Sequence, residues 1–107
     1  MSRRVVITGM GWVTPLGAEI EGVWKRLLNS ESGVSRTELF DAKTFPTTFS
    51  AQVKNFDLAS FLGPRFEDHK HASRNVGFAL AAAEMAWRSA KLNGTPGVDP
   101  SMVGVYL

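Results

Sequence analysis

Two short apolar runs, one near each end of this 107-residue chain, constrain its fold most strongly. Residues 5–8 read Val-Val-Ile-Thr and are closed by Gly9, and residues 102–107 read Met-Val-Gly-Val-Tyr-Leu. Continuous runs of this length are typical of strands covered on both faces, as in a parallel sheet. We therefore predict strands at residues 5–8 and 103–107, each of which needs neighbouring layers to cover it.

Two helices are predicted between these strands. Residues 18–30 place apolar side chains at i, i+3, i+4, i+7 and i+8, which forms one stripe, and Gly33 is expected to supply the left-handed stop. Residues 70–92 carry two rows of small and apolar side chains that cross at Ala83 and leave out Ala81. Small side chains allow close approach, so we expect this helix to be buried on much of its surface.

The rest of the chain adds one strand and one short turn. Residues 49–53 alternate apolar and polar side chains, which indicates a strand, and Asp57 is expected to cap a turn that ends at Gly63. Residues 29–37 read as an exposed loop. The order strand, helix, strand, helix, strand predicts an α/β fold. Because natural C-termini seldom end on a core strand, we expect the chain to be part of a longer protein.

Composition excludes several classes of function. Apolar residues make up 44% and charged residues 21%, which is ordinary for a globular protein. The net charge of +2, without basic runs interleaved with aromatics, does not favour nucleic-acid binding. No cysteine is present, so disulfides and thiolate metal sites are excluded. No window predicts a signal peptide or a membrane span, and a cytoplasmic location is expected.

Motifs that could carry chemistry have simpler interpretations. Gly9-Met10-Gly11 follows a predicted strand, but a dinucleotide fingerprint needs Gly or Ala at position 14, where this chain has Thr. The glycine-rich loop of residues 9–17 must bend tightly or let something approach closely, and for Gly-Met-Gly itself a structural tight turn is favoured. His69 and His71 are two residues apart and would point to different sides of a helix, so no metal site is predicted. The three tryptophans are predicted to be core residues; they are Trp12, Trp24 and Trp87.

The chain from Arg3 to Leu107 resembles the N-terminal part of a β-ketoacyl-acyl carrier protein synthase of the chain-elongating type. The segments that carry the resemblance are Arg-Arg-Val-Val-Ile-Thr-Gly-Met-Gly (3–11), Thr-Pro-Leu-Gly (14–17), Trp-Lys-Arg-Leu-Leu (24–28), Ser-Glu-Ser-Gly-Val (30–34), Phe-Asp (40–41), Phe-Ala-Leu-Ala-Ala-Ala (78–83) and Val-Gly-Val (103–105). The resemblance covers nearly the whole chain but only about the first quarter of a family member.

This resemblance implies a thiolase-like fold, with two related α/β halves in α/β/α/β/α layers, in a homodimer. Residues 1–107 would form the front of the N-terminal domain, cut within the strand at 103–107. The implied reaction is a decarboxylative Claisen condensation, in which a Cys thiolate holds the acyl chain and two His residues assist attack by malonyl-carrier protein. None of these three catalytic residues matches a position of the present chain, and the resemblance implies no cofactor.

The resemblance also implies that an acidic acyl carrier protein docks on basic residues at the start of the long helix. The candidates are Arg65, Lys70, His71 and Arg74. Ala72-Ser73 stands where the family usually has Met-Asp, so the local packing departs from the family pattern. An ordinary solvated helix end is the competing interpretation.

Three other functions stay open from the sequence. The first is a non-catalytic relative of the chain-length-factor type, and the second is a thiolase-group enzyme that acts on coenzyme A esters. The third is a free-standing α/β binding module. A nucleophilic Cys followed by two His residues beyond position 107 would distinguish a condensing enzyme from the non-catalytic relative.

Overall fold

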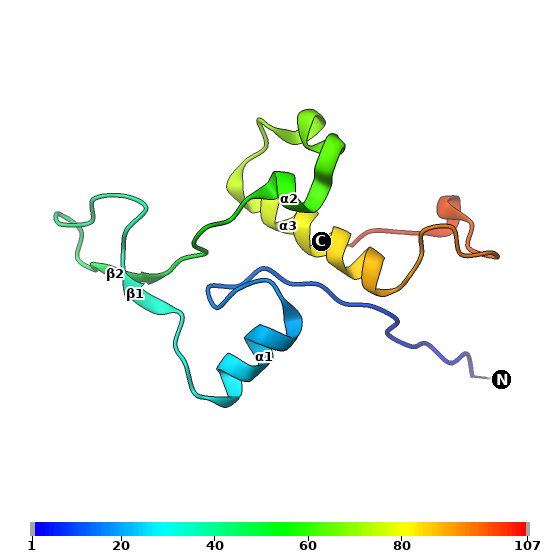
Figure 1. Cartoon of the computed structure of the whole chain (residues 1–107), viewed down its shortest axis with the longest axis horizontal. Helices are drawn as coiled ribbons and strands as arrows, with labels where there is room; N and C mark the ends of the chain where they lie inside the picture. The colour runs from blue at the N-terminus through cyan, green and yellow to red at the C-terminus, as the bar shows by residue number, and fades with distance from the viewer. Residues whose placement is uncertain (1, 107) are drawn as a thin grey trace.

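Helices and one pair of short strands make up the computed structural model, which describes residues 2–106 (Figure 1). The elements in chain order are α1 (Ile20–Leu28), β1 (Val34–Arg36), β2 (Phe49–Ala51), α2 (Leu58–Leu62), the 3-10 segment η1 (Gly63–His69), α3 (Arg74–Ser89) and the 3-10 turn η2 (Pro100–Met102). The described residues thus contain helices and a small sheet, which is part of an α/β arrangement.

Helix α1 is a capped amphipathic helix, as the apolar stripe predicts. The Glu19 carboxylate accepts hydrogen bonds from the backbone N–H groups of Glu21 at 3.2 Å and Gly22 at 2.7 Å. The helix ends at Leu28, and Ser30 takes the left-handed backbone conformation with φ 58°. The prediction of Gly33 as the stop residue is therefore wrong. Gly33 instead allows Pro15 to approach, because a Cβ there would lie 2.7 Å from the proline ring.

Strands β1 and β2 pair as an antiparallel hairpin, in the register Val34↔Ala51, Ser35↔Ser50 and Arg36↔Phe49. This confirms the strand predicted at 49–53 over residues 49–51 and shows that the loop predicted over 29–37 is wrong at 34–36. The inward positions are polar, because Ser35 and Ser50 are half-buried while their neighbours on each strand are exposed. Alternation predicts β2 because Phe49 and Ala51 flank Ser50, whereas in β1 only Val34 is apolar.

The two strands predicted at the chain ends are absent from the described residues. Residues 5–8 and 103–106 form no strand, and Val5 is 91% exposed. A strand exists only when another strand accepts its backbone hydrogen bonds, and no other described segment pairs with either run. The only sheet among residues 2–106 is the antiparallel hairpin, so the parallel sheet is not found there. Leu107 lies outside the described residues.

Helix α2 packs against both α3 and η1, so these three elements form one packed unit (Figure 1). Asp57 caps α2 as predicted, since its carboxylate accepts from the Ala59 N–H at 3.1 Å, and Gly63 ends the helix with φ 57°. Phe56 joins the elements: its ring stacks on Phe61 with centroids 5.8 Å apart and meets Phe78 edge-on at 4.9 Å.

The helix predicted over 70–92 is shorter, and its buried face is not the predicted one. α3 begins at Arg74 after the Ser73 cap and ends at Ser89. Ala81 is 0% exposed, whereas Ala83 is exposed. The prediction that the apolar rows cross on the buried side at Ala83 is therefore wrong for this chain. The reason is that α2 packs on α3, and Arg65 of η1 reaches Glu84 on the side of α3 where Ala81 and Glu84 are buried.

The N-terminal segment lies against the other half of α3. A Cβ on Gly11 would lie 2.2 Å from the Ala82 carbonyl oxygen, and one on Gly9 would lie 2.5 Å from that of Ala86. Such distances are far inside van der Waals contact, so only glycine permits this approach. The Gly-Met-Gly motif is thus explained by close packing on a helix. The tight turn predicted at the motif is wrong, because the turn of this loop lies at residues 14–17.

The described residues bury few side chains. The buried hydrophobic residues are Val23, Ala42, Leu62 and Ala81, and the radius of gyration is 17.3 Å. Trp24 is 54% exposed, so its prediction as a core residue is wrong in this chain, while Trp12 and Trp87 are half-buried. The chain is therefore an open scaffold whose apolar surfaces are largely uncovered.

Candidate functional site

The four basic residues implied as a docking surface surround the connection between η1 and α3. Arg65 lies on η1, Lys70 and His71 lie in the turn that follows, and Arg74 is the first residue of α3. All four are exposed. The site therefore combines the short 3-10 segment η1, which carries Arg65, with the capped start of α3, which carries Arg74.

The structure places Lys70 and Arg74 together and Arg65 apart from them. Lys70 and Arg74 both line a pocket of about 360 Å³, whose other walls are Phe56, Asp57, Leu58, Phe66, His69, Ala72, Ser73 and Gly77. Arg65 lines a different pocket of about 440 Å³, together with Leu62, His69, Leu80, Ala83, Glu84, Trp87 and Asn93. His71 lines neither pocket. The predicted surface is thus two neighbouring regions, and His69 borders both.

Each guanidinium or ammonium group of the docking candidates has a partner. The Lys70 Nζ lies 2.8 Å from a Glu67 carboxylate oxygen in an exposed ion pair. The Arg74 guanidinium donates to the Val53 carbonyl and lies 5.0 Å from the centroid of the Phe78 ring, a cation–π contact. Arg74 is therefore held in one direction by its surroundings, whereas Lys70 is held only by another mobile surface side chain.

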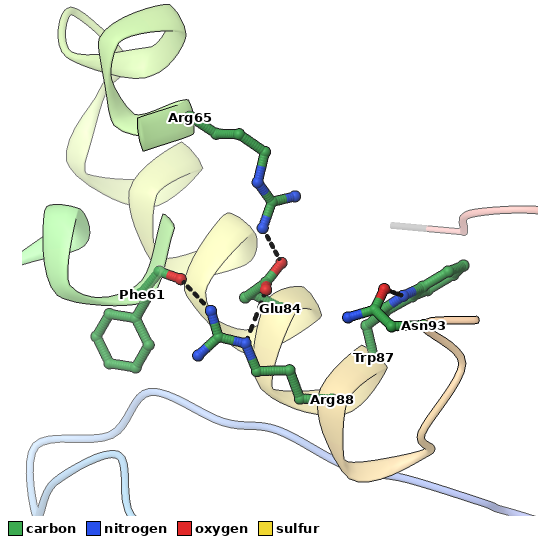
Figure 2. A network of polar contacts seen from close by, with 6 residues as sticks. All are labelled: Phe61, Arg65, Glu84, Trp87, Arg88 and Asn93. Carbon is green, nitrogen blue, oxygen red and sulfur yellow. Dashed lines mark hydrogen bonds and ion pairs between the residues drawn. The ribbon is translucent and has the colours of Figure 1, made fainter. Parts of the chain in front are cut away.

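Arg65 belongs to a second polar network, centred on Glu84 (Figure 2). Arg65 Nη2 donates to Glu84 Oε2 at 2.6 Å, and Arg88 Nε donates to Glu84 Oε1 at 2.8 Å. Arg88 Nη2 also donates to the Phe61 carbonyl at 3.0 Å. One carboxylate on α3 thus connects α2 and η1 through two arginines.

Glu84 remains ionised despite being buried. Its residue is 9% exposed. The hydrogen bond from Arg65 lowers the pKa of Glu84 below the ordinary value of 4.5; burial acts in the opposite direction, and the Arg65 and Arg88 charges reinforce the lowering. Sequence reasoning missed this residue. The available signal was the Glu84–Arg88 spacing of i, i+4, which pairs opposite charges on a helix.

The described residues were compared with the requirements of a metal site and of a membrane-spanning helix. Among residues 2–106, no group of three or more His, Asp and Glu side chains is placed to hold a metal ion. Trp87 Nε1 donates to Asn93 Oδ1 at 2.7 Å, which ties the loop after α3 to the helix (Figure 2). No helix within the described part of the chain is long and apolar enough to cross a membrane.

Known proteins share both the sequence and the arrangement of this chain. The family model described as "Beta-ketoacyl synthase, N-terminal domain" matches residues 2–107. The 3-oxoacyl-[acyl-carrier-protein] synthase 2 of Coxiella burnetii is 41% identical over 90 residues, which are 84% of this chain and 21% of the relative. The chloroplastic 3-oxoacyl-[acyl-carrier-protein] synthase I of Arabidopsis thaliana is 35% identical over 92 residues, covering 86% of this chain and 19% of the relative.

A solved structure agrees with these sequence matches. The ishigamide ketosynthase/chain length factor superposes with a TM-score of 0.67 at 26% identity, over 83% of this chain and 22% of that chain. The present chain thus spans about a fifth of the length of the proteins it matches. Since the family model covers residues 2–107 and several relatives exceed 30% identity, the chain belongs to the β-ketoacyl synthase family and matches its N-terminal domain.

Proposed function

We propose that this chain is part of a condensing enzyme, a 3-oxoacyl-[acyl-carrier-protein] synthase that elongates acyl chains in fatty-acid or polyketide synthesis. The observation that carries the proposal is the match of residues 2–107 to the N-terminal domain of the family, together with relatives that bear this name. The proposal includes the two-halved thiolase-like fold, a homodimer and a cytoplasmic location. In it, residues 1–107 are the front of the N-terminal domain.

The proposed reaction is a decarboxylative Claisen condensation. A Cys thiolate takes the acyl chain from its carrier, malonyl-carrier protein loses CO2, and the resulting carbanion attacks the thioester carbonyl. This chain contains no cysteine, so the nucleophile must lie in another part of the protein. Within the described residues, α3 and the segments packed on it would supply scaffold and surface rather than reacting groups.

The part of the function that we propose for this chain is docking of the acyl carrier protein. Lys70, His71 and Arg74 present exposed basic groups around one helix start, with Arg65 nearby on η1. Carrier proteins are acidic, and a like-signed patch speeds the encounter with a partner of opposite charge. The pocket of about 360 Å³ that Lys70 and Arg74 line also has Phe56, Leu58 and Phe66 in its walls, which offer packing area next to the charges.

Reversing two of these charges tests the docking proposal. In the full-length enzyme, Lys70→Glu combined with Arg74→Glu should raise KM for acyl-carrier protein and leave turnover of a small acyl-coenzyme A substrate nearly unchanged. A matched control is Lys25→Glu with Lys43→Glu, which changes the net charge equally on α1 and on the β1–β2 connection. Normal kinetics of the first variant with carrier-protein substrates at low salt would refute docking at this surface.

A non-catalytic partner of the chain-length-factor type is the second candidate. It is favoured by one observation, the similarity to a solved ketosynthase/chain length factor. Incubating the full-length protein with labelled acyl-carrier protein distinguishes the two candidates. A condensing enzyme should retain the label as a thioester that hydroxylamine removes, whereas a chain-length-factor relative should not become acylated. Absence of both the adduct and the condensation product would refute the enzyme proposal.

A further inference from the structure

The 3-10 segment η1 is connected to α3 through a single buried carboxylate. Among residues 2–106, the bond from Arg65 to Glu84 is the only side-chain hydrogen bond that joins η1 to α3. It is short, at 2.6 Å, and Glu84 is almost fully enclosed. Figure 2 shows the carboxylate between Arg65 and Arg88, with Arg88 reaching the Phe61 carbonyl of α2. We call Arg65, Glu84 and Arg88 the clamp.

This bond differs from an ordinary surface ion pair. Exposed pairs contribute little because water screens them and both side chains lose freedom. Here one partner is buried and each carboxylate oxygen receives a separate charged donor. Removing the charge of Glu84 would leave two guanidinium groups facing a neutral side chain. The clamp therefore has more influence on local structure than the Lys70–Glu67 pair, in which Glu67 is 71% exposed.

Segment η1 depends on such an external contact. A 3-10 segment has poorer hydrogen-bond geometry than an α-helix, and runs longer than a few residues are uncommon. η1 spans Gly63–His69 and has no side-chain cap at its start. η1 packs on α2, and the Arg65–Glu84 hydrogen bond is what holds it to α3. Lys70 and His71 follow η1 immediately, so movement of η1 moves them as well.

We infer that Glu84 is a positioning residue for carrier-protein docking: through Arg65 it fixes η1 on α3 and thereby sets where Lys70 and His71 stand. Arg65 is then an anchor whose charge is balanced by Glu84, rather than a free docking charge. The inference rests on the proposed docking function and adds a residue that touches no carrier protein itself.

An effect of net charge alone and a positioning role of Glu84 predict opposite changes in the KM for acyl-carrier protein when Glu84 is replaced by Gln. The substitution keeps the size of the side chain and makes the region one unit more positive. If only charge mattered, binding of an acidic carrier would strengthen and its KM would fall. If Glu84 positions η1, KM for the carrier should instead rise, by roughly two- to fivefold, because the docking charges lose their fixed placement.

The matched control is Glu67→Gln. It makes the same charge change three residues before Lys70, at a carboxylate that is exposed and outside the clamp. This variant should lower KM for acyl-carrier protein or leave it unchanged. Both variants should keep kcat with an acyl-coenzyme A substrate, which shows that the fold and the chemistry are intact.

Amide hydrogen exchange over residues 63–69 of the full-length enzyme supplies a readout independent of docking. Exchange should become roughly tenfold faster in Glu84→Gln and stay unchanged in Glu67→Gln. If Glu84→Gln folds poorly, Arg65→Gln removes the same bond from its exposed side and should also accelerate exchange over residues 63–69.

The outcomes separate this inference from the docking proposal. Faster exchange with a raised carrier KM supports positioning by Glu84. Unchanged exchange in both clamp variants, or faster exchange with an unchanged or lowered carrier KM, overturns it while leaving docking intact. If Lys70→Glu with Arg74→Glu leaves carrier KM unchanged, docking at this surface has failed, and the positioning role fails with it even where exchange responds.

Discussion

Glu84 makes the clamp sensitive to acid. Its folded pKa lies below the ordinary value of 4.5, first because of the hydrogen bond from Arg65. A carboxyl group with a lowered folded pKa contributes stability that is fully present above the unfolded pKa and is lost as pH falls through the folded pKa. We therefore expect the melting-temperature difference between wild type and Glu84→Gln to be constant near neutrality and to shrink below about pH 4.5. A difference that stays constant down to pH 3 would contradict this assignment.

Ala81 and Ala83 lie two residues apart on α3 and show which side of the helix is buried. Ala81 is fully enclosed and Ala83 is exposed. Ala81→Leu should overpack the contact with the neighbouring elements and cost roughly 1–3 kcal/mol of unfolding free energy, and Ala83→Leu should cost less. Denaturant unfolding of both full-length variants measures this. A larger cost at Ala83 would restore the helical phase that the sequence predicts, and equal costs would contradict the burial of Ala81 alone.

At the level of elements, the contact between the N-terminal segment and α3 depends on glycine. A Cβ at Gly11 would lie 2.2 Å from a backbone oxygen, which cannot move aside as a flexible side chain can. Gly11→Ala should therefore separate the two segments and destabilise the full-length protein by roughly 1–3 kcal/mol or more. Gly104→Ala is the control, since its Cβ would meet only a Tyr106 ring atom at an ordinary 3.7 Å. Similar melting temperatures for both variants would show that the segment does not pack this way.

The elements differ in how far the sequence could predict them. Asp57 and the stripe of α1 are local signals, and the structure confirms both. The phase of α3 was misjudged because alanines occupy several of its sides, so periodicity alone does not select one. β1 was missed because its inward residue is Ser35 rather than an apolar side chain. Glu84 was missed because its importance depends on Arg65, which lies 19 positions away.

At the scale of the whole molecule, the described chain is extended. Its radius of gyration is 17.3 Å, whereas a compact domain of about 100 residues has roughly 13 Å. Several apolar side chains of residues 5–7, α1 and the C-terminal segment are exposed, and no large side chain within residues 2–106 is fully buried. The family resemblance in the sequence is confirmed, whereas the strands predicted from the two terminal apolar runs are not found. Those strands need hydrogen-bonding partners, and the described residues provide none.

We accordingly expect residues 1–107, expressed alone, to lack a cooperative melt. Hydrophobic burial from four small or medium side chains cannot balance the backbone entropy of a chain this long. The isolated peptide should bind a hydrophobic dye, show poorly dispersed amide resonances and tend to associate. A sharp two-state transition of a monomer, with well-dispersed resonances, would contradict this expectation.

The contact between Gly11 and Ala82 also determines when, during synthesis, this part of the fold can form. The two residues are 82 − 11 = 71 positions apart, so the ribosome releases the first segment long before its helix exists. At about 5–20 residues per second, that interval is roughly 4–14 seconds. Throughout it, Gly9 and Gly11 lack the helix surface on which they pack in the finished structure. The contact between the N-terminal segment and α3 can therefore form only late in synthesis, after the residues of α3 have left the ribosome.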